Sequence, residues 1–178
     1  MNVAREIPLN PNIVIYHADE ALTSRIVEAY RSPDAAAPAP IRGLLERGAV
    51  SVHMTRYKMS VRKPTDADML TFLQDVEPAV CEWAGQAVIP AAPDRMPKWR
   101  EFATPFDGTQ AGGREVYESS DCAAASRTAD ALFGIPGVAE LVLTSESATV
   151  AKGVLFAGTD LTPRVEQALR TVEPTEPD

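Results

Sequence analysis

The stretch that most constrains the fold is the heptapeptide LFGIPGV at residues 132–138. It closes an apolar helical run that begins near Ser126. Gly134 suits the positive φ of a helix C-cap, and Pro136 cannot continue a helix. Gly137 then releases the chain into an apolar strand. The segment therefore predicts a helix that ends, a tight turn and the start of a strand.

A weaker copy of this segment, LLERGAV, lies at residues 44–50 and also precedes an alternating apolar run. Two further anchors follow in both halves: V-x-K at 61–63 and 150–152, and a helical proline at Pro78 and Pro163. The spacing between the first two anchors differs by one residue when Val50 is matched to Val138, which a β-bulge can absorb. Three anchors in one order favour an internal duplication. The alternative is the hairpin-and-helix rhythm that many α+β proteins repeat.

Apolar alternation and turn signals predict the elements of the first half. Strands are expected at 13–17, 50–54 and 57–61, a further strand at 25–31 or a short helix from Ala21, and a helix at 41–46. A proline inside a helix costs about 3 kcal/mol. The last helix is therefore expected to start around Pro78, after a separate helical turn.

The second half predicts the same order of elements. Strands are expected at 98–102, 114–118, 138–144 and 148–152, a helix from Ser120 or Asp121 to Phe133, and a last helix capped by Thr162 and opened by Pro163. The order β-β-α-β-β-α predicts an α+β fold of two similar halves, each a four-stranded antiparallel sheet with two helices on one face. The expected domains are residues 1–88 and 98–173, with a linker at 89–97 and a disordered tail at 174–178.

The formal net charge of −8 argues against nucleic-acid binding through the whole surface. The first half also contains a basic cluster of Arg56, Lys58, Arg62 and Lys63. We interpret it as a solvated strand edge, where the charges prevent pairing with another copy of the strand. No apolar run is long enough to span a bilayer, and the first residues lack a signal-peptide pattern. We therefore expect a cytoplasmic protein without nucleic-acid or membrane partners.

Residues with catalytic or metal-binding potential are few and scattered. His17, His53, Cys81 and Cys122 include no close-spaced pair of the kind that zinc and iron–sulfur sites use. Both cysteines are expected to be free thiols, and the half that contains Cys122 has no histidine to act as its base. The sequence predicts no catalytic residue, metal ligand or cofactor, and no enzymatic activity.

The motifs together resemble the N-terminal domain of Nfu/NifU-type iron–sulfur scaffold proteins. The second half carries the sharper match, LFGIPGV followed by TVAK at 149–152, and the first half carries NPN at 10–12 and SVRK at 60–63. The resemblance implies a tandem pair of such domains. Full-length Nfu scaffolds hold the cluster with a CxxC motif in a separate C-terminal domain. Because this sequence has no CxxC, cluster-scaffold activity is not carried over.

The candidate interaction surface is the sheet face turned away from the helices, which a two-layer fold leaves open. Val14, Tyr16 and His53 are expected on that face in the first half, and Trp99 in the second. Apolar and aromatic residues there indicate packing of one half on the other or binding of a partner protein.

We therefore expect a non-enzymatic protein-interaction or accessory module, which the resemblance links to the iron–sulfur assembly machinery as partner. The alternative is a small-molecule-binding regulatory protein with a ligand pocket between two α+β halves. The sequence does not indicate an oligomeric state.

Overall fold

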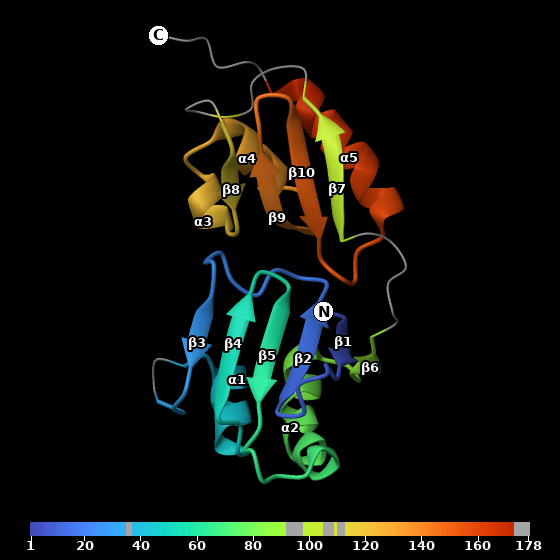
Figure 1. The fold of residues 1–178 in the computed structure, drawn as a ribbon. Helices are drawn as coiled ribbons and strands as arrows, with labels where there is room; N and C mark the ends of the chain where they lie inside the picture. The colour runs from blue at the N-terminus through green and yellow to red at the C-terminus, as the bar shows by residue number, and fades with distance from the viewer. Residues whose placement is uncertain (35–36, 92–97, 105–108, 110–112, 173–178) are drawn as a thin grey trace. The chain divides into compact units, whose positions relative to one another are not determined.

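The computed structural model describes residues 1–34, 37–91, 98–104, 109 and 113–172 (Figure 1). The chain forms two compact units, Met1–Thr23 with Val27–Pro93, and Ser24–Ile26 with Asp94–Asp178. Each unit has its own sheet and its own hydrophobic core. The predicted α+β fold with two halves is confirmed.

The first unit contains a six-stranded sheet with the order β3-β4-β5-β2-β1-β6. Its elements are β1 (Val3–Glu6), β2 (Ile13–Ala18), β3 (Glu28–Tyr30), α1 (Ala39–Glu46), β4 (Ser51–Thr55), β5 (Lys58–Arg62), α2 (Met69–Ala84) and β6 (Ile89–Pro90). The strand alternative for residues 25–31 is the correct one. The sheet has two strands more than the expected four, because β1 pairs antiparallel with β2, and β6 pairs parallel with β1.

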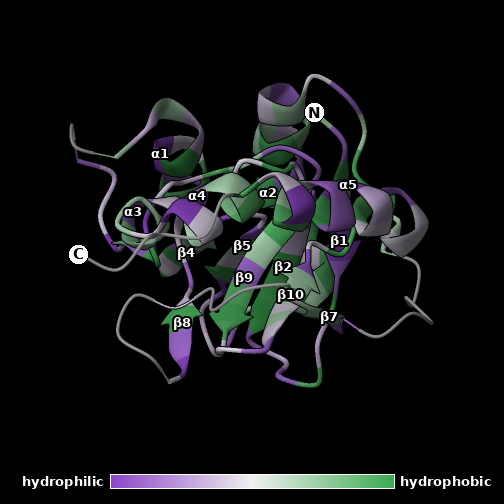
Figure 2. Cartoon of the chain, turned by 90° about the horizontal axis from the view of Figure 1, so that it is seen from above, coloured by the Kyte–Doolittle hydropathy of each residue, from purple (hydrophilic) through white to green (hydrophobic). Residues whose placement is uncertain are grey.

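The second unit contains a four-stranded antiparallel sheet with the order β7-β10-β9-β8. Its elements are β7 (Trp99–Ala103), β8 (Glu115–Tyr117), α3 (Ser120–Ala123), α4 (Arg127–Phe133), β9 (Val138–Leu143), β10 (Ser147–Lys152) and α5 (Gly158–Thr171). In each unit the long helices lie on one side of the strands (Figure 2). Their apolar faces bury the core, with Leu132, Phe133 and Val165 among the least exposed side chains of the second unit.

The strands β3-β4-β5-β2 of the first sheet have the same order as β8-β9-β10-β7 of the second. The helices α1 and α4 precede the inner hairpins, and α2 and α5 follow them. Gly48 and Gly137, which lead into the inner hairpins, have φ angles of 96° and 101°. A residue without a Cβ adopts this left-handed conformation at no steric cost. The common topology and these two glycines support the internal duplication.

The register aligns the two units without an inserted residue. Ser51 pairs with Arg62 in the first hairpin, and Glu140 pairs with Ala151 in the second. Ser51 is therefore equivalent to Glu140, so the match of Val50 to Val138 was shifted by one residue. With the corrected alignment, each positive-φ glycine lies at the same distance in sequence from the buried lysine that ends the hairpin, Lys63 or Lys152.

The helix α2 runs unbroken through Pro78, contrary to the expected start at that residue. Its N-cap is Asp68, whose carboxylate accepts a 2.9 Å hydrogen bond from the Thr71 amide. Pro78 and Gln74 both lie on the exposed side of the helix, so water can reach the carbonyl that the proline leaves without a donor. Burial of the opposite face holds the helix together across the proline.

Helix ends in the second unit also differ from the expected ones. The alanine-rich segment forms two helices, capped by Ser119 and Ser126 instead of Ser120 or Asp121. Gly134 keeps a right-handed φ of −62°, and Gly137 takes the left-handed conformation instead.

The helix α5 begins at Gly158, ahead of the expected start at Pro163. The Thr162 hydroxyl donates to the Gly158 carbonyl, 2.7 Å away, instead of capping the helix. Residues 89 and 90 of the expected linker form β6, whereas 92–97 and the expected tail at 174–178 lie outside the described residues. No helix in the described ranges has the length and apolarity to cross a membrane.

Candidate functional site

Two of the four residues of the candidate interaction surface lie in the core instead. Val14 and Tyr16 are 0% and 1% exposed and pack in the first hydrophobic cluster, so their expected exposure is wrong. Both faces of β2 carry apolar side chains, and alternation alone does not reveal which face meets the helices. Of the other two, His53 is exposed on the open face of its sheet, and Trp99 is exposed at the start of β7.

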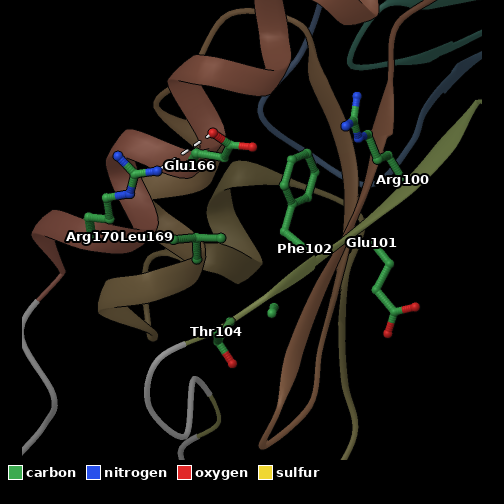
Figure 3. Close-up of a pocket in the computed structure, with 8 residues that line it drawn as sticks. Arg100, Glu101, Phe102, Thr104, Glu166, Leu169 and Arg170 are labelled. Carbon is green, nitrogen blue, oxygen red and sulfur yellow. Dashed lines mark ion pairs between the residues drawn. The ribbon is translucent and has the colours of Figure 1, made fainter.

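The second unit has a groove of about 530 Å³ between strand β7 and helix α5 (Figure 3). In the close-up, the Phe102 side chain points toward α5, and Glu101 points away from it. Leu169 and an ion pair between Glu166 and Arg170, with a nitrogen–oxygen distance of 3.8 Å, form the helix side. The Thr104 hydroxyl at one end is buried and has no hydrogen-bond partner in the described structure.

A smaller cavity of about 240 Å³ shares Arg100 and Phe102 with this groove. Val150 and Leu161 give it an apolar wall. The Arg100 guanidinium donates a 2.8 Å hydrogen bond to the Thr162 hydroxyl at its rim. The two cavities together follow β7 along its length. We call them the β7 groove.

The outer edge of β7 is unpaired among the described strands. The Thr104 amide donates to the Glu146 carbonyl, and the Lys98 carbonyl accepts from the Lys152 amide, so these peptide groups point toward β10. Peptide groups alternate in direction along a strand. Those of Trp99, Glu101 and Ala103 therefore point to the outer edge, where they can bind another extended chain.

The first unit covers the equivalent edge with its own strand. Tyr16, the counterpart of Phe102, lies on β2, whose outer edge pairs with β1. From β1, Val3 enters the core at 1% exposure, and Arg5 forms an ion pair with Glu77 of α2. No described strand occupies the corresponding place beside β7.

Metal-binding and nucleophilic groups are not assembled into a site in the part of the chain that the structure describes. No group of three or more His, Cys, Asp or Glu residues there is placed to hold a metal ion. Cys81 is half-buried and Cys122 exposed, both as free thiols. The His17 ring nitrogen lies 2.6 Å from the Glu6 carboxylate, which joins β2 to β1. These contacts give His17 a structural role.

The sequence matches no protein-family model and no curated protein. Among solved structures, the chain is similar to the X-ray crystal structure of protein SAV1430 from Staphylococcus aureus. The two sequences are 25% identical over a match that covers 45% of this chain and 99% of that one, with a TM-score of 0.41.

Proposed function

We propose that this protein is a non-enzymatic binding module that takes up an extended segment of a partner protein at the outer edge of β7. The observation that carries the proposal is the difference between the two units. The first unit covers this edge with β1, and no described strand covers it in the second. Strand addition to an exposed sheet edge is a recurrent mode of peptide recognition.

The contacts of β1 indicate the chemistry of the bound segment. Val3 and Arg5 of β1 both face the helix, where one is buried and the other meets the acidic Glu77. In the second unit, Phe102 and Leu169 offer an apolar surface and Glu166 a carboxylate. We therefore expect a segment with an apolar residue and a basic residue two positions apart.

The resemblance to Nfu/NifU N-terminal domains makes iron–sulfur assembly proteins the first partners to test. Because the sequence lacks a CxxC motif, the proposed role is accessory and includes no cluster binding. The alternative of a regulatory ligand pocket between the two halves stays a prediction.

Glu101 offers a sharp test of strand addition. Glu101→Pro removes an outward-pointing amide without removing a hydrogen bond to β10, whereas Glu101→Ala removes the same side chain and keeps the amide. Peptides selected on the full chain by display would be measured by calorimetry. We expect Glu101→Pro to weaken binding at least about 10-fold, and Glu101→Ala by no more than about 2-fold.

Three further readouts complete the test. Circular dichroism of both variants checks that the sheet is intact, and amide NMR shifts locate the bound peptide. The proposal would be contradicted if the proline variant bound the peptide as tightly as the wild-type protein does. It would also be contradicted if the peptide changed amide chemical shifts only outside β7. If the purified chain took up iron under anaerobic conditions, the proposal that its role includes no cluster binding would be contradicted.

A further inference from the structure

The open face of the first sheet carries a second, polar groove with a volume of about 520 Å³. The residues that matter for its chemistry are Asn10, Asn12, Arg31, Ser51, His53 and Arg62. They come from the turn before β2, the end of β3 and the paired strands β4 and β5. The groove lies on the opposite face of the sheet from the buried Val52 and Val61.

The strand register sets the two arginines on either side of one serine. Ser51 pairs directly with Arg62, and Tyr30 pairs with Val52, so Arg31 lies next to Ser51 on its other side. Neighbouring strands are about 4.8 Å apart, which separates the arginine backbones by about 10 Å. Side chains of this length can both reach an ion above Ser51. His53 lies on the same face, two residues further along β4.

The positive charge of this groove is not neutralised within the described part of the chain. None of its lining residues is a carboxylate, and no ion pair there engages Arg31 or Arg62. The planar guanidinium group matches phosphate and carboxylate oxygens with two parallel hydrogen bonds. A groove with two such groups and no carboxylate among its lining residues is suited to an anion.

Hydrogen bonds within the turn leave further donors available. The Asn10 side-chain oxygen accepts from the Asn12 amide at 3.0 Å, and the Asn12 side-chain oxygen accepts from the Lys63 ammonium at 3.3 Å. The carbonyls of Pro64 and Ala67 also accept from Lys63, which is buried and fixes the turn. Because both asparagine oxygens are engaged, their NH₂ groups are the ends left for a ligand.

The second unit shows that the fold does not require a basic row at this place. The equivalents of Arg31, Ser51 and Arg62 are Glu118, Glu140 and Ala151. Glu140 there forms an ion pair with Lys98, with a nitrogen–oxygen distance of 2.7 Å. The same sheet position is thus basic in one unit and acidic in the other.

We propose that the groove binds a small molecule through a doubly charged, phosphate-type oxyanion. Arg31 and Arg62 bind its oxygens from two sides, and Ser51, His53 and the asparagine amides contribute hydrogen bonds. This site lies in the first unit, whereas the β7 groove lies in the second. A ligand here and a peptide there would be separate activities.

Calorimetry and amide NMR with inorganic phosphate and phenyl phosphate test the proposal, at constant ionic strength with chloride as the reference salt. We expect saturable binding of phenyl phosphate with shifts at residues 51–53 and 60–62. Arg62→Gln and Arg31→Gln should each weaken it at least about 10-fold. Lys58→Gln is the matched control, because Lys58 lies on the same strand and face as Arg62 but outside the groove. It should weaken binding no more than about 2-fold.

Several outcomes would overturn the proposal. Equal losses for Lys58→Gln and Arg62→Gln would show diffuse charge attraction instead of a site. If neither phosphate probe saturated at millimolar concentrations, the groove would not be a binding site for a phosphate-type oxyanion. Binding of an oligonucleotide or of an acidic peptide without binding of phenyl phosphate would replace a small-molecule site by a macromolecular one. Thermal unfolding of each variant separates loss of the site from loss of the fold.

Discussion

The Tyr117 hydroxyl donates a 2.6 Å hydrogen bond to the carboxylate of Glu115, two residues earlier in β8. In the other unit, the Tyr30 hydroxyl donates to Glu28 in β3 at 2.5 Å. The two tyrosines occupy equivalent places, because Tyr30 pairs with Val52 and Tyr117 with the corresponding Leu141. Glu-x-Tyr in the outer strand is therefore a further anchor of the repeat, in addition to the three anchors described above.

Removing a tyrosine hydroxyl should have opposite consequences at two buried positions. Tyr117→Phe loses the bond to Glu115 and should lower the free energy of unfolding of the second unit by about 1 kcal/mol. The Tyr16 hydroxyl is buried without a partner in the described structure, so Tyr16→Phe should be neutral or stabilise the first unit by up to about 1 kcal/mol.

Urea unfolding followed through amide signals of each unit measures both changes. If Tyr16→Phe lowered the free energy of unfolding as much as Tyr117→Phe does, the Tyr16 hydroxyl would have a hydrogen-bond partner such as a bound water.

Stability should decrease as the pH rises above about 10. Burial raises the pKa of Tyr16 above its usual value, and the negative charge of Glu77 adds to the shift. Burial also raises the pKa of Tyr117, together with its hydrogen bond to Glu115. Since the folded pKa is raised, the unfolded chain loses these protons first. This stabilisation is complete below the unfolded pKa and is lost as the pH rises toward the folded pKa.

Urea titrations of the wild-type protein and Tyr16→Phe at pH 9 and pH 11 test this dependence. One tyrosine contributes a slope of at most about 1.4 kcal/mol per pH unit. The substitution should remove the Tyr16 contribution from the first unit. An unchanged slope would show that Tyr16 does not cause the alkaline loss.

Alanine should be tolerated much better at Gly48 than at Gly137. Both glycines have positive φ, which costs an L-residue about 1–2 kcal/mol. A Cβ at Gly48 meets nothing within 4 Å, whereas one at Gly137 would lie 2.7 Å from the Phe156 ring. We expect Gly137→Ala to destabilise the second unit by about 3 kcal/mol or more, because the half-buried Phe156 ring must also shift.

Thermal unfolding monitored by amide signals of each unit would compare the two glycine variants. Gly137→Ala combined with Phe156→Ala should separate the two causes, because the double variant removes the contact with the ring and keeps the backbone strain. If Gly48→Ala and Gly137→Ala lowered the unfolding temperature of their units equally, contact with Phe156 would not contribute to the cost at Gly137.

Local patterns were sufficient to predict the inner hairpins and the turns that lead into them. The strands β4, β5, β9 and β10 follow from alternation over five or six residues. The turn before β9 was also predicted, but its positive φ lies at Gly137 and not at Gly134. The strands β1 and β6 were missed because each is short and its pairing uses backbone groups that every residue has. For the same reason, the open edge of β7 has no signal of its own.

The sequence by itself determined an α+β fold with two similar halves, because apolar periodicity and glycine positions act within a few residues of one another. Only the tertiary structure decided that Tyr16 is buried and that β1 covers the edge beside it. It also brought Arg31 and Arg62 to one groove from separate strands. Periodicity reports that side chains alternate between two faces. Which face receives the helices, and which edge receives another strand, depends on contacts between residues far apart in the chain.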